Sequence, residues 1–350
     1  MSNKYLLAVV AGLYALTSDA QVLGGQFAHA WLSAAPTAQT TGLAGWQLRL
    51  DGRDPGLVNF NPATLNANTD RVVHLSQEFY AGEINRSALA AGLHVDRWDI
   101  DAGLTVRYVD YGDFEGRDFR GERTADFNAR DYAIGGAFAK TLNERVRVGA
   151  QLQLIGGSLE QYNSLGAAVS AGLTYTPDSA QRTVWGVQAQ HAGYLWNQLT
   201  EQNDPLPFEL SVGVSRRLAY LPLRFGILYR RLDRWDLLYD DPDRRESTVL
   251  IGDDDAERGA ASEFLDNLAR HFAFNAELYL GKKEVVQLRV GYDHQRQREL
   301  RLAEARSLAG FSFGFGLNLR RVRIDYGRGI QHLGGGTNHL GLLVDFGSKA

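Results

Sequence analysis

The sequence contains no cysteine, which excludes disulfides, thiolate metal sites and cysteine nucleophiles and leaves the redox compartment open. It also lacks any internal apolar run near the roughly 20 residues of a membrane-spanning helix, and its mean hydropathy is -0.27. A bundle of membrane helices is therefore excluded. Basic residues are not in excess either, because the net charge is -4. Nucleic acid is accordingly not expected as a partner.

Motifs of catalysis and metal binding are missing as well. The 8 histidines are scattered without His-Glu-x-x-His spacing, and no Gly-x-Ser-x-Gly elbow is present. The glycines of 327–329 and 334–336 do not lead from a strand into a helix, so they predict a hairpin loop rather than a phosphate-binding loop. We therefore predict a protein that is not an enzyme, with no catalytic residue, cofactor or metal ligand.

The sequence does contain strand alternation, seen most clearly over residues 146–157. Leu152 and Leu154 are apolar, whereas Gln151 and Gln153 on the other face are polar. The stretch is about as long as a strand that crosses a bilayer at a tilt, roughly 9 to 11 residues. Fourteen such segments follow residue 71. This is an even number, as single-chain bacterial outer-membrane barrels require.

The connections between these segments alternate in length. Short linkers lie at 96–98, 141–144, 176–180, 219–221, 281–283 and 320–321. The longer ones include 111–128, 194–207, 232–269 and 294–308. Short turns at one end and long loops at the other predict an all-β, 14-stranded antiparallel transmembrane outer-membrane barrel with periplasmic turns and extracellular loops. A soluble barrel with its apolar face inward shows the same alternation and is the alternative.

The polar faces of the strands are predicted to line the barrel lumen. Their larger side chains are Arg107, Gln151, Gln153, Gln188, Gln190, Arg224, Arg230, Glu277, Gln287, Arg289, Asp293, Arg323 and Asp325. Aromatic residues at the apolar strand ends predict interfacial girdles. They are Phe79, Tyr108, Tyr132, Tyr175, Tyr229 and Tyr292, with Phe346 near the end of the closing strand.

The chain before the barrel divides into two parts. Residues 1–20 carry a short positive start, an apolar stretch and the small residues Ser18 and Ala20, which predict a cleaved signal peptide. An uncleaved anchor or a buried strand is the alternative. Residues 21–70 are punctuated by Gly and Pro, and we expect them to fold back as a plug inside the barrel of 71–350.

Two segments of the predicted wall turn small residues inward. They are Gly166, Ala168, Ser170 and Gly172 in the sixth strand, and Ser312, Gly314 and Gly316 in the twelfth. Our hypothesis is that the plug packs against these two places. Weak β-propensity alone is the other explanation of the glycines.

Several N-terminal motifs together point to a known family. They are residues 27–32, Thr37 to Gln39 leading into 42–45, residues 54–65 with the plug motif Asn61, Pro62 and Ala63, and the first hairpin at 78–85. With fourteen strands behind them, they resemble the PorQ-like and PorV-like barrels of the type IX secretion system, within the FadL long-chain fatty-acid transporter superfamily. Gln39 stands where the pattern usually has Arg.

The resemblance implies an outer-membrane component of the type IX attachment complex in a Gram-negative, Bacteroidota-type bacterium. Such a component anchors a PorZ-like soluble surface protein, with PorU-like and PorV-like components and lipopolysaccharide as further partners. FadL-like relatives instead pass hydrophobic small molecules through the wall. A transporter predicts an apolar pocket beneath the long loops and a lateral opening, whereas an anchor predicts a sealed wall and a partner-binding surface.

The linker after the ninth strand is the candidate partner-binding loop. Phe264, Leu265 and Leu268 lie at helical spacing, so they predict an amphipathic helix that binds a partner or covers the barrel mouth as a lid. The acidic residues of 240–243 and 253–255 lack EF-hand spacing, so a solvated turn is favoured over calcium or lipopolysaccharide binding. A phospholipase would need Ser170 and His191 to face lipid.

Overall fold

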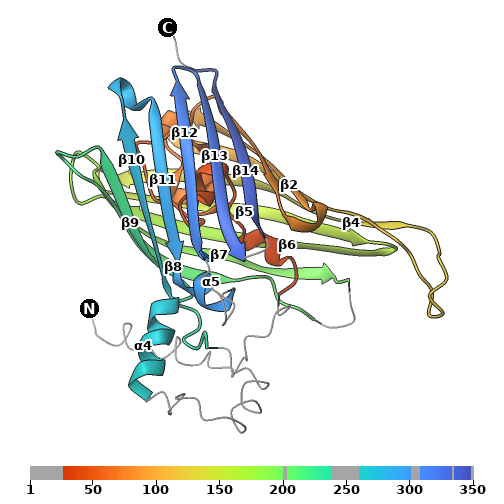
Figure 1. Ribbon diagram of the computed structural model, residues 1–350. Helices are drawn as coiled ribbons and strands as arrows, with labels where there is room; N and C mark the ends of the chain where they lie inside the picture. Colours follow the sequence, from red (N-terminus) through yellow and green to blue (C-terminus); the bar gives the residue numbers. More distant parts are fainter. Residues whose placement is uncertain (1–26, 200–202, 239–259, 301–307, 333–334, 348–350) are drawn as a thin grey trace, which may run out of the picture.

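The computed structural model describes residues 27–199, 203–238, 260–300, 308–332 and 335–347. In these residues fourteen strands form one closed antiparallel barrel, and β1 (Val72–Phe79) closes the ring against β14 (Gly335–Asp345) (Figure 1). The strands between them are β2 (Asn85–Val95), β3 (Ile100–Phe114), β4 (Phe127–Asn143), β5 (Val146–Leu159), β6 (Tyr162–Tyr175), β7 (Thr183–Asn197), β8 (Glu209–Arg217), β9 (Leu223–Tyr229), β10 (Phe272–Leu280), β11 (Val286–Asp293), β12 (Phe311–Leu319) and β13 (Val322–His332). The predicted fold class is confirmed.

The apolar face of the wall points outward. On β5, Leu152 and Leu154 are 57% and 50% exposed, whereas Gln151 and Gln153 are buried at 2% and 1%. Outward apolar side chains elsewhere on the wall include Leu104, Ile134, Val187, Phe313 and Leu342. A soluble barrel would bury this face, so that alternative is wrong. An apolar band around a polar interior is the arrangement of a transmembrane barrel.

The two ends of the barrel differ in their connections. The turn end carries the short linkers, such as Arg320 and Arg321 between β12 and β13, and it is also where β14 finishes. The opposite end, which we call the loop end, carries α4 (Ala260–Arg270) and α5 (His294–Glu299) (Figure 1). No helix in the described part of the chain is long and apolar enough to span a membrane.

The wall is taller on one side than on the other. Strands β3 to β7 have 14 to 17 residues, whereas β8 to β12 have 7 to 9. The linker predicted at 111–128 is therefore partly wrong, because β3 and β4 continue into it after a bulge and pair Phe114 with Phe127. Their rings stack with centroids 5.4 Å apart, and the resulting hairpin projects far from the barrel (Figure 1).

Residues 27–70, which we call the lumenal segment, run through the inside of the barrel (Figure 1). Their elements are η1 (Ala30–Ser33), α2 (Ala38–Thr41), η2 (Pro55–Asn59), η3 (Pro62–Thr64) and η4 (Ala67–Thr69). Side-chain caps start the turns: Thr37 forms a capping box with Thr40, and Asp54, Asn61 and Asn66 each accept a backbone N–H two residues on. Short capped turns satisfy the backbone polar groups of a segment without strands.

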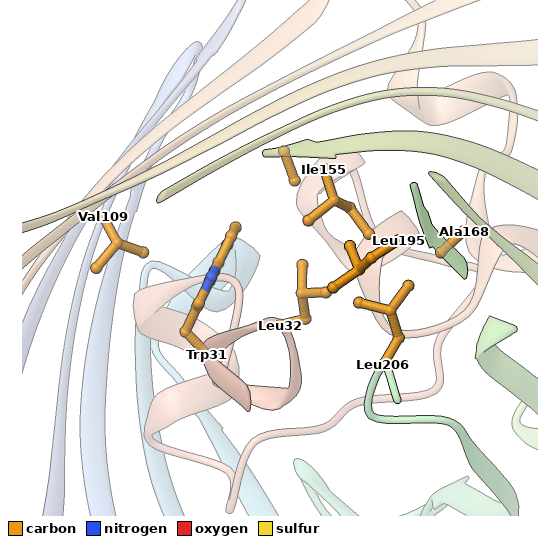
Figure 2. Packing of buried hydrophobic residues seen from close by; sticks show 8 residues of the cluster. Trp31, Leu32, Val109, Ile155, Ala168, Leu195 and Leu206 are labelled. Atoms are coloured by element: carbon orange, nitrogen blue, oxygen red, sulfur yellow. The ribbon is translucent and has the colours of Figure 1, made fainter. Parts of the chain in front are cut away.

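The apolar core lies between this segment and the wall. Near the loop end, Trp31 and Leu32 of η1 contact Val109, Ile155 and other residues of the tall wall (Figure 2). Trp46, Leu48 and Phe60 form a second cluster with wall residues of β7, β9 and β10. Burying each large apolar side chain contributes roughly 1.5 to 3 kcal/mol. The segment therefore supplies the core that the polar inner face of the wall lacks.

Candidate functional site

Near the turn end, buried ion pairs join the lumenal segment to the wall. A guanidinium nitrogen of Arg323 lies 2.7 Å from one carboxylate oxygen of Asp54, and His74 Nδ1 lies 2.7 Å from the other. Arg323 also pairs with Asp325 at 2.6 Å, and Asp325 pairs with Arg289 at 2.7 Å. Burial alone would raise the pKa of the Asp54 carboxyl, but His74 and Arg323 outweigh it and hold this pKa well below its usual range.

A second set of polar contacts continues the network along the lumen. Gln47 donates to Glu277 at 2.9 Å, and Glu277 also pairs with Arg289 at 2.8 Å. Asp51 accepts from Arg224 of β9 at 2.7 Å and from Arg49 at 3.1 Å. Buried charges are tolerated because each is paired and hydrogen-bonded. Of the predicted lumen-facing residues, Arg224, Glu277 and Arg323 thus contact the segment, whereas Arg230 pairs with Glu209 and Asp293 of the wall.

Close backbone approach explains some of the inward glycines of the wall. A Cβ on Gly172 of β6 would lie 1.9 Å from Asn61 Oδ1, and one on Gly149 of β5 would lie 2.4 Å from Pro62. At β12, a Cβ on Gly42 would lie 3.0 Å from Gly314, and the Ala44 N–H donates to Ser312 at 3.0 Å. The plug motif lies against β5 and β6, and α2 lies against β12. Contact with the segment therefore explains Gly172 and Gly314, whereas a Cβ on Gly166 or Gly316 would meet side chains or backbone of the wall itself.

The lumen beside the segment is narrow near the loop end and opens at the turn end, where a hollow of about 490 Å³ lies beside Asp51. The cavity beneath the loops, lined by Trp46, Gln190, Glu209 and Arg230 among others, holds about 30 Å³. Such a space admits a few water molecules, since about 10 to 15 Å³ of such space holds one. A second cavity, beside Trp31, holds about 10 Å³. All neighbouring strands of the described barrel are hydrogen-bonded to each other. Neither cavity matches the apolar pocket that a transporter predicts.

The helix α4 is attached to the loop end through Trp235 and Leu237. Asn267 donates to the Trp235 carbonyl at 2.7 Å and accepts from the Leu237 N–H at 2.9 Å. Trp235 also packs on Phe264, with ring centroids 5.4 Å apart. Phe264 nevertheless stays 53% exposed, Leu265 is 62% exposed and Leu268 is half-buried. Two of the three predicted residues are therefore exposed apolar side chains of an attached helix.

Asp266 is the charged centre of the α4 attachment. Its carboxylate accepts from Arg298 of α5 at 2.6 Å and from Arg270 at 3.0 Å. Partial burial would raise the pKa of this carboxyl, but the hydrogen bonds and charges of Arg298 and Arg270 outweigh it and lower the pKa. The helix packs on α5 and the start of β10 at the rim (Figure 1). Sequence reasoning missed Trp235, Asn267 and Asp266 as its attachment.

The remaining predictions have clear positions. Ser170 and His191 are both buried inside the barrel, and their contact is a backbone one, from the His191 N–H to Ser170 Oγ at 3.1 Å. The lipid-facing pair that a phospholipase needs is therefore not formed by them. The signal peptide and both acidic stretches fall outside the described residues. Among the residues that are described, no cluster of His, Asp and Glu could hold a metal ion.

Comparison with known proteins yields structural neighbours. No protein-family model matches the chain, and no curated protein matches it. The toluene transporter TodX of Pseudomonas putida is similar at 12% identity, over 89% of this chain and 96% of that one, with a TM-score of 0.48. A FadL homologue of Pseudomonas aeruginosa is similar at 12% identity, over 89% of this chain and 98% of that one, with a TM-score of 0.47. The CymD monoaromatic hydrocarbon channel is similar at 16% identity, over 90% of this chain and 97% of that one, with a TM-score of 0.48.

The strand pairing and the filled lumen define the class of protein by themselves. The chain is a fourteen-stranded outer-membrane-type β-barrel whose interior is occupied by its own N-terminal residues. Among solved structures it is similar to FadL-like barrels. By their own descriptions TodX is a toluene transporter and CymD is a monoaromatic hydrocarbon channel.

Proposed function

We propose that this protein is a plugged, non-enzymatic barrel that anchors a soluble partner at the cell surface. The observation that carries the proposal is the filled lumen, where buried ion pairs and apolar packing hold the segment against opposite sides of the wall. A barrel filled in this way leaves its loops as the surface that interacts. The orientation proposed with it places the loop end outside the cell and the turn end in the periplasm.

The partner is proposed from the sequence resemblance. PorQ-like barrels of type IX secretion hold a PorZ-like soluble protein at the surface, together with PorU-like or PorV-like components and lipopolysaccharide. The exposed side chains of Phe264 and Leu265 on α4 support this reading, because an exposed apolar helix face suits docking of a partner. The resemblance and this face are the two supports for a role in secretion.

Affinity purification of the tagged protein from gently solubilised outer membranes tests the proposal. We expect a large soluble surface protein to purify with the barrel, and Leu265→Asp to lower its recovery at least tenfold. Ser262→Asp is the matched control, because it adds the same charge at an exposed position of the same helix. Equal recovery with both variants would refute α4 as the docking surface, and recovery of the barrel alone would refute the anchor.

Transport of hydrophobic molecules is the second candidate function. Two of the structural neighbours, the toluene transporter TodX and the CymD monoaromatic hydrocarbon channel, match it by their own descriptions. One feature of this chain also favours it: an apolar hollow outside the wall and the small cavity beside Trp31 are both lined by Ser76, Ser87, Ala88 and Tyr108. A lateral route would cross the wall at this place. Uptake of toluene into vesicles that contain the barrel, at a rate above that of empty vesicles, would favour transport over anchoring.

A further inference from the structure

A hollow of about 560 Å³ lies on the outer surface of the barrel, between β13 and β3. The part of the hollow nearer the turn end is lined by one row of outward side chains that are paired across five strands. They are Val106, Leu89, Leu75, Leu342 and Ile324. The volume falls within the roughly 300 to 1,000 Å³ of pockets that bind small molecules. This row is wholly apolar.

The next row toward the loop end contains a polar pair. It consists of Tyr108, Ser87, Gln77 and Leu340. Ser87 Oγ donates to Gln77 Oε1 at 2.6 Å. The side-chain N–H groups of Gln77 have no partner among the residues that the structure describes. An amide donor without a partner is costly in hydrocarbon, so a lipid-facing Gln calls for an acceptor from outside the chain.

The row beyond it marks the membrane interface. It pairs Asp110, Asn85, Phe79, Asn338 and Arg328 across the same five strands. Four of these side chains are polar and one is a girdle aromatic. Because alternate residues of a strand are roughly 7 Å apart, Gln77 lies about that distance along β1 from Phe79, on the side away from the interface. From the interface inward, the hollow thus presents a hydrogen-bond donor and then apolar side chains.

We propose that this hollow binds one acyl chain of a membrane lipid from the leaflet at the loop end. The chain extends inward from Gln77 across the apolar row that contains Leu75, and the ester carbonyl at its head accepts a hydrogen bond from the Gln77 amide. In a membrane lipid the ester carbonyl likewise lies nearer the interface than the acyl hydrocarbon does. A second barrel would offer a convex apolar wall that neither fills a concave site nor supplies an acceptor. The proposal rests on the lipid-facing wall and is independent of the anchoring function.

Native mass spectrometry of the purified barrel in detergent, with added phosphatidylethanolamine, tests the site. We expect one tightly held lipid per barrel. Val106→Trp fills the hollow and should weaken binding at least tenfold. Leu154→Trp, an equally outward change on β5, should leave binding unchanged. Both variants are compared as folded barrels, judged by heat-dependent migration in gels.

An ether-linked analogue, which lacks the carbonyl, tests the role of Gln77. Wild type should prefer the ester lipid about three- to tenfold, as one hydrogen bond allows, and Gln77→Leu should remove this preference. Equal binding by the two tryptophan variants, or no ester preference in wild type, would overturn the proposal. A wild-type dimer that is lost only in Val106→Trp would overturn it too, since the occupant would then be a second copy. The affinity purification that tests the anchoring function does not affect any of these outcomes, so the two proposals can fail separately.

Discussion

The lumenal segment is held by two unlike contacts. At the turn end the contact is ionic, with Asp54 between Arg323 and His74. At the loop end it is apolar, with Trp31 and Leu32 against the tall wall (Figure 2). An ionic contact depends on every partner, because a single loss leaves a buried charge unpaired. An apolar contact weakens gradually with the area removed. The segment therefore combines a contact that fixes its position with one that tolerates variation.

The largest effect is expected from breaking the ionic contact. Arg323→Met roughly keeps the length of the side chain but removes the guanidinium that pairs with both Asp54 and Asp325, so we expect a loss of roughly 3 to 5 kcal/mol in the free energy of unfolding. Denaturant unfolding in detergent micelles, followed by tryptophan fluorescence, measures it. Arg320→Met in the exposed turn is the control and should change stability by less than about 0.5 kcal/mol. A similar small change in both variants would show that the ion pairs do not hold the segment.

The apolar contact should respond less strongly. Trp31→Ala removes the largest side chain of the loop-end cluster, and roughly 3 kcal/mol is expected to be lost. Limited proteolysis should then cut the first residues of the segment before those near Asp54. Trp196→Ala, on the exposed outer face of β7, is the matched control and should leave the pattern of cutting unchanged. Uniform cutting along the segment in Trp31→Ala would mean that the two contacts are not separate.

A smaller effect is expected where the segment touches the wall backbone. Gly172→Ala forces a methyl group against Asn61 and should cost roughly 1 to 3 kcal/mol by overpacking. Gly136→Ala is the control, because a Cβ there has no atom within 4 Å. Differential unfolding of the two variants in one detergent checks the prediction. Equal stability would mean that the plug motif yields to the added methyl group.

Acid should loosen one contact more than the other. The folded pKa of Asp54 lies below its value of 3.8 in the unfolded chain, so its stabilisation is present above pH 3.8 and is lost as the pH falls through the folded pKa. Trp31 and Leu32 carry no acid group, although His29 beside them pairs with Asp131 at 3.3 Å. Hydrogen exchange at pH 5 and pH 3, corrected for intrinsic rates, should show a larger loss of protection near η2 than near η1 at the lower pH. An equal loss of protection in both regions would contradict the comparison.

The barrel could be predicted from the sequence because its pattern is local. Gln151 and Leu152 point to opposite faces of one strand, and their polarity indicates that the two faces have different surroundings. The linker lengths indicate which end of the barrel carries the long loops. The inward glycines were informative for the same reason, since Gly172 and Gly314 lie at regular strand positions. These signals depend only on the spacing of residues within one strand, so they can be recognised without knowing how the strands pair.

Features that depend on distant pairing could not be read in this way. The extension of β3 and β4 rests on Phe114 meeting Phe127, which lie on opposite sides of a linker. The attachment of α4 rests on Asn267 and Trp235, thirty-two residues apart. The lipid-facing Gln77 breaks the apolar alternation of β1, and its meaning appears only when Ser87 is placed beside it. Register across strands, rather than the pattern within them, carries this information.

The measurement that tests the filled lumen most directly is the electrical conductance of single barrels in planar bilayers. The account predicts no steady current steps for the wild-type protein, because the ionic and apolar contacts leave no water-filled path through the lumen. Arg323→Met should add brief openings as the turn-end contact is lost. Stable open steps in the wild type at low voltage would contradict the account, since they require a continuous aqueous path beside the segment.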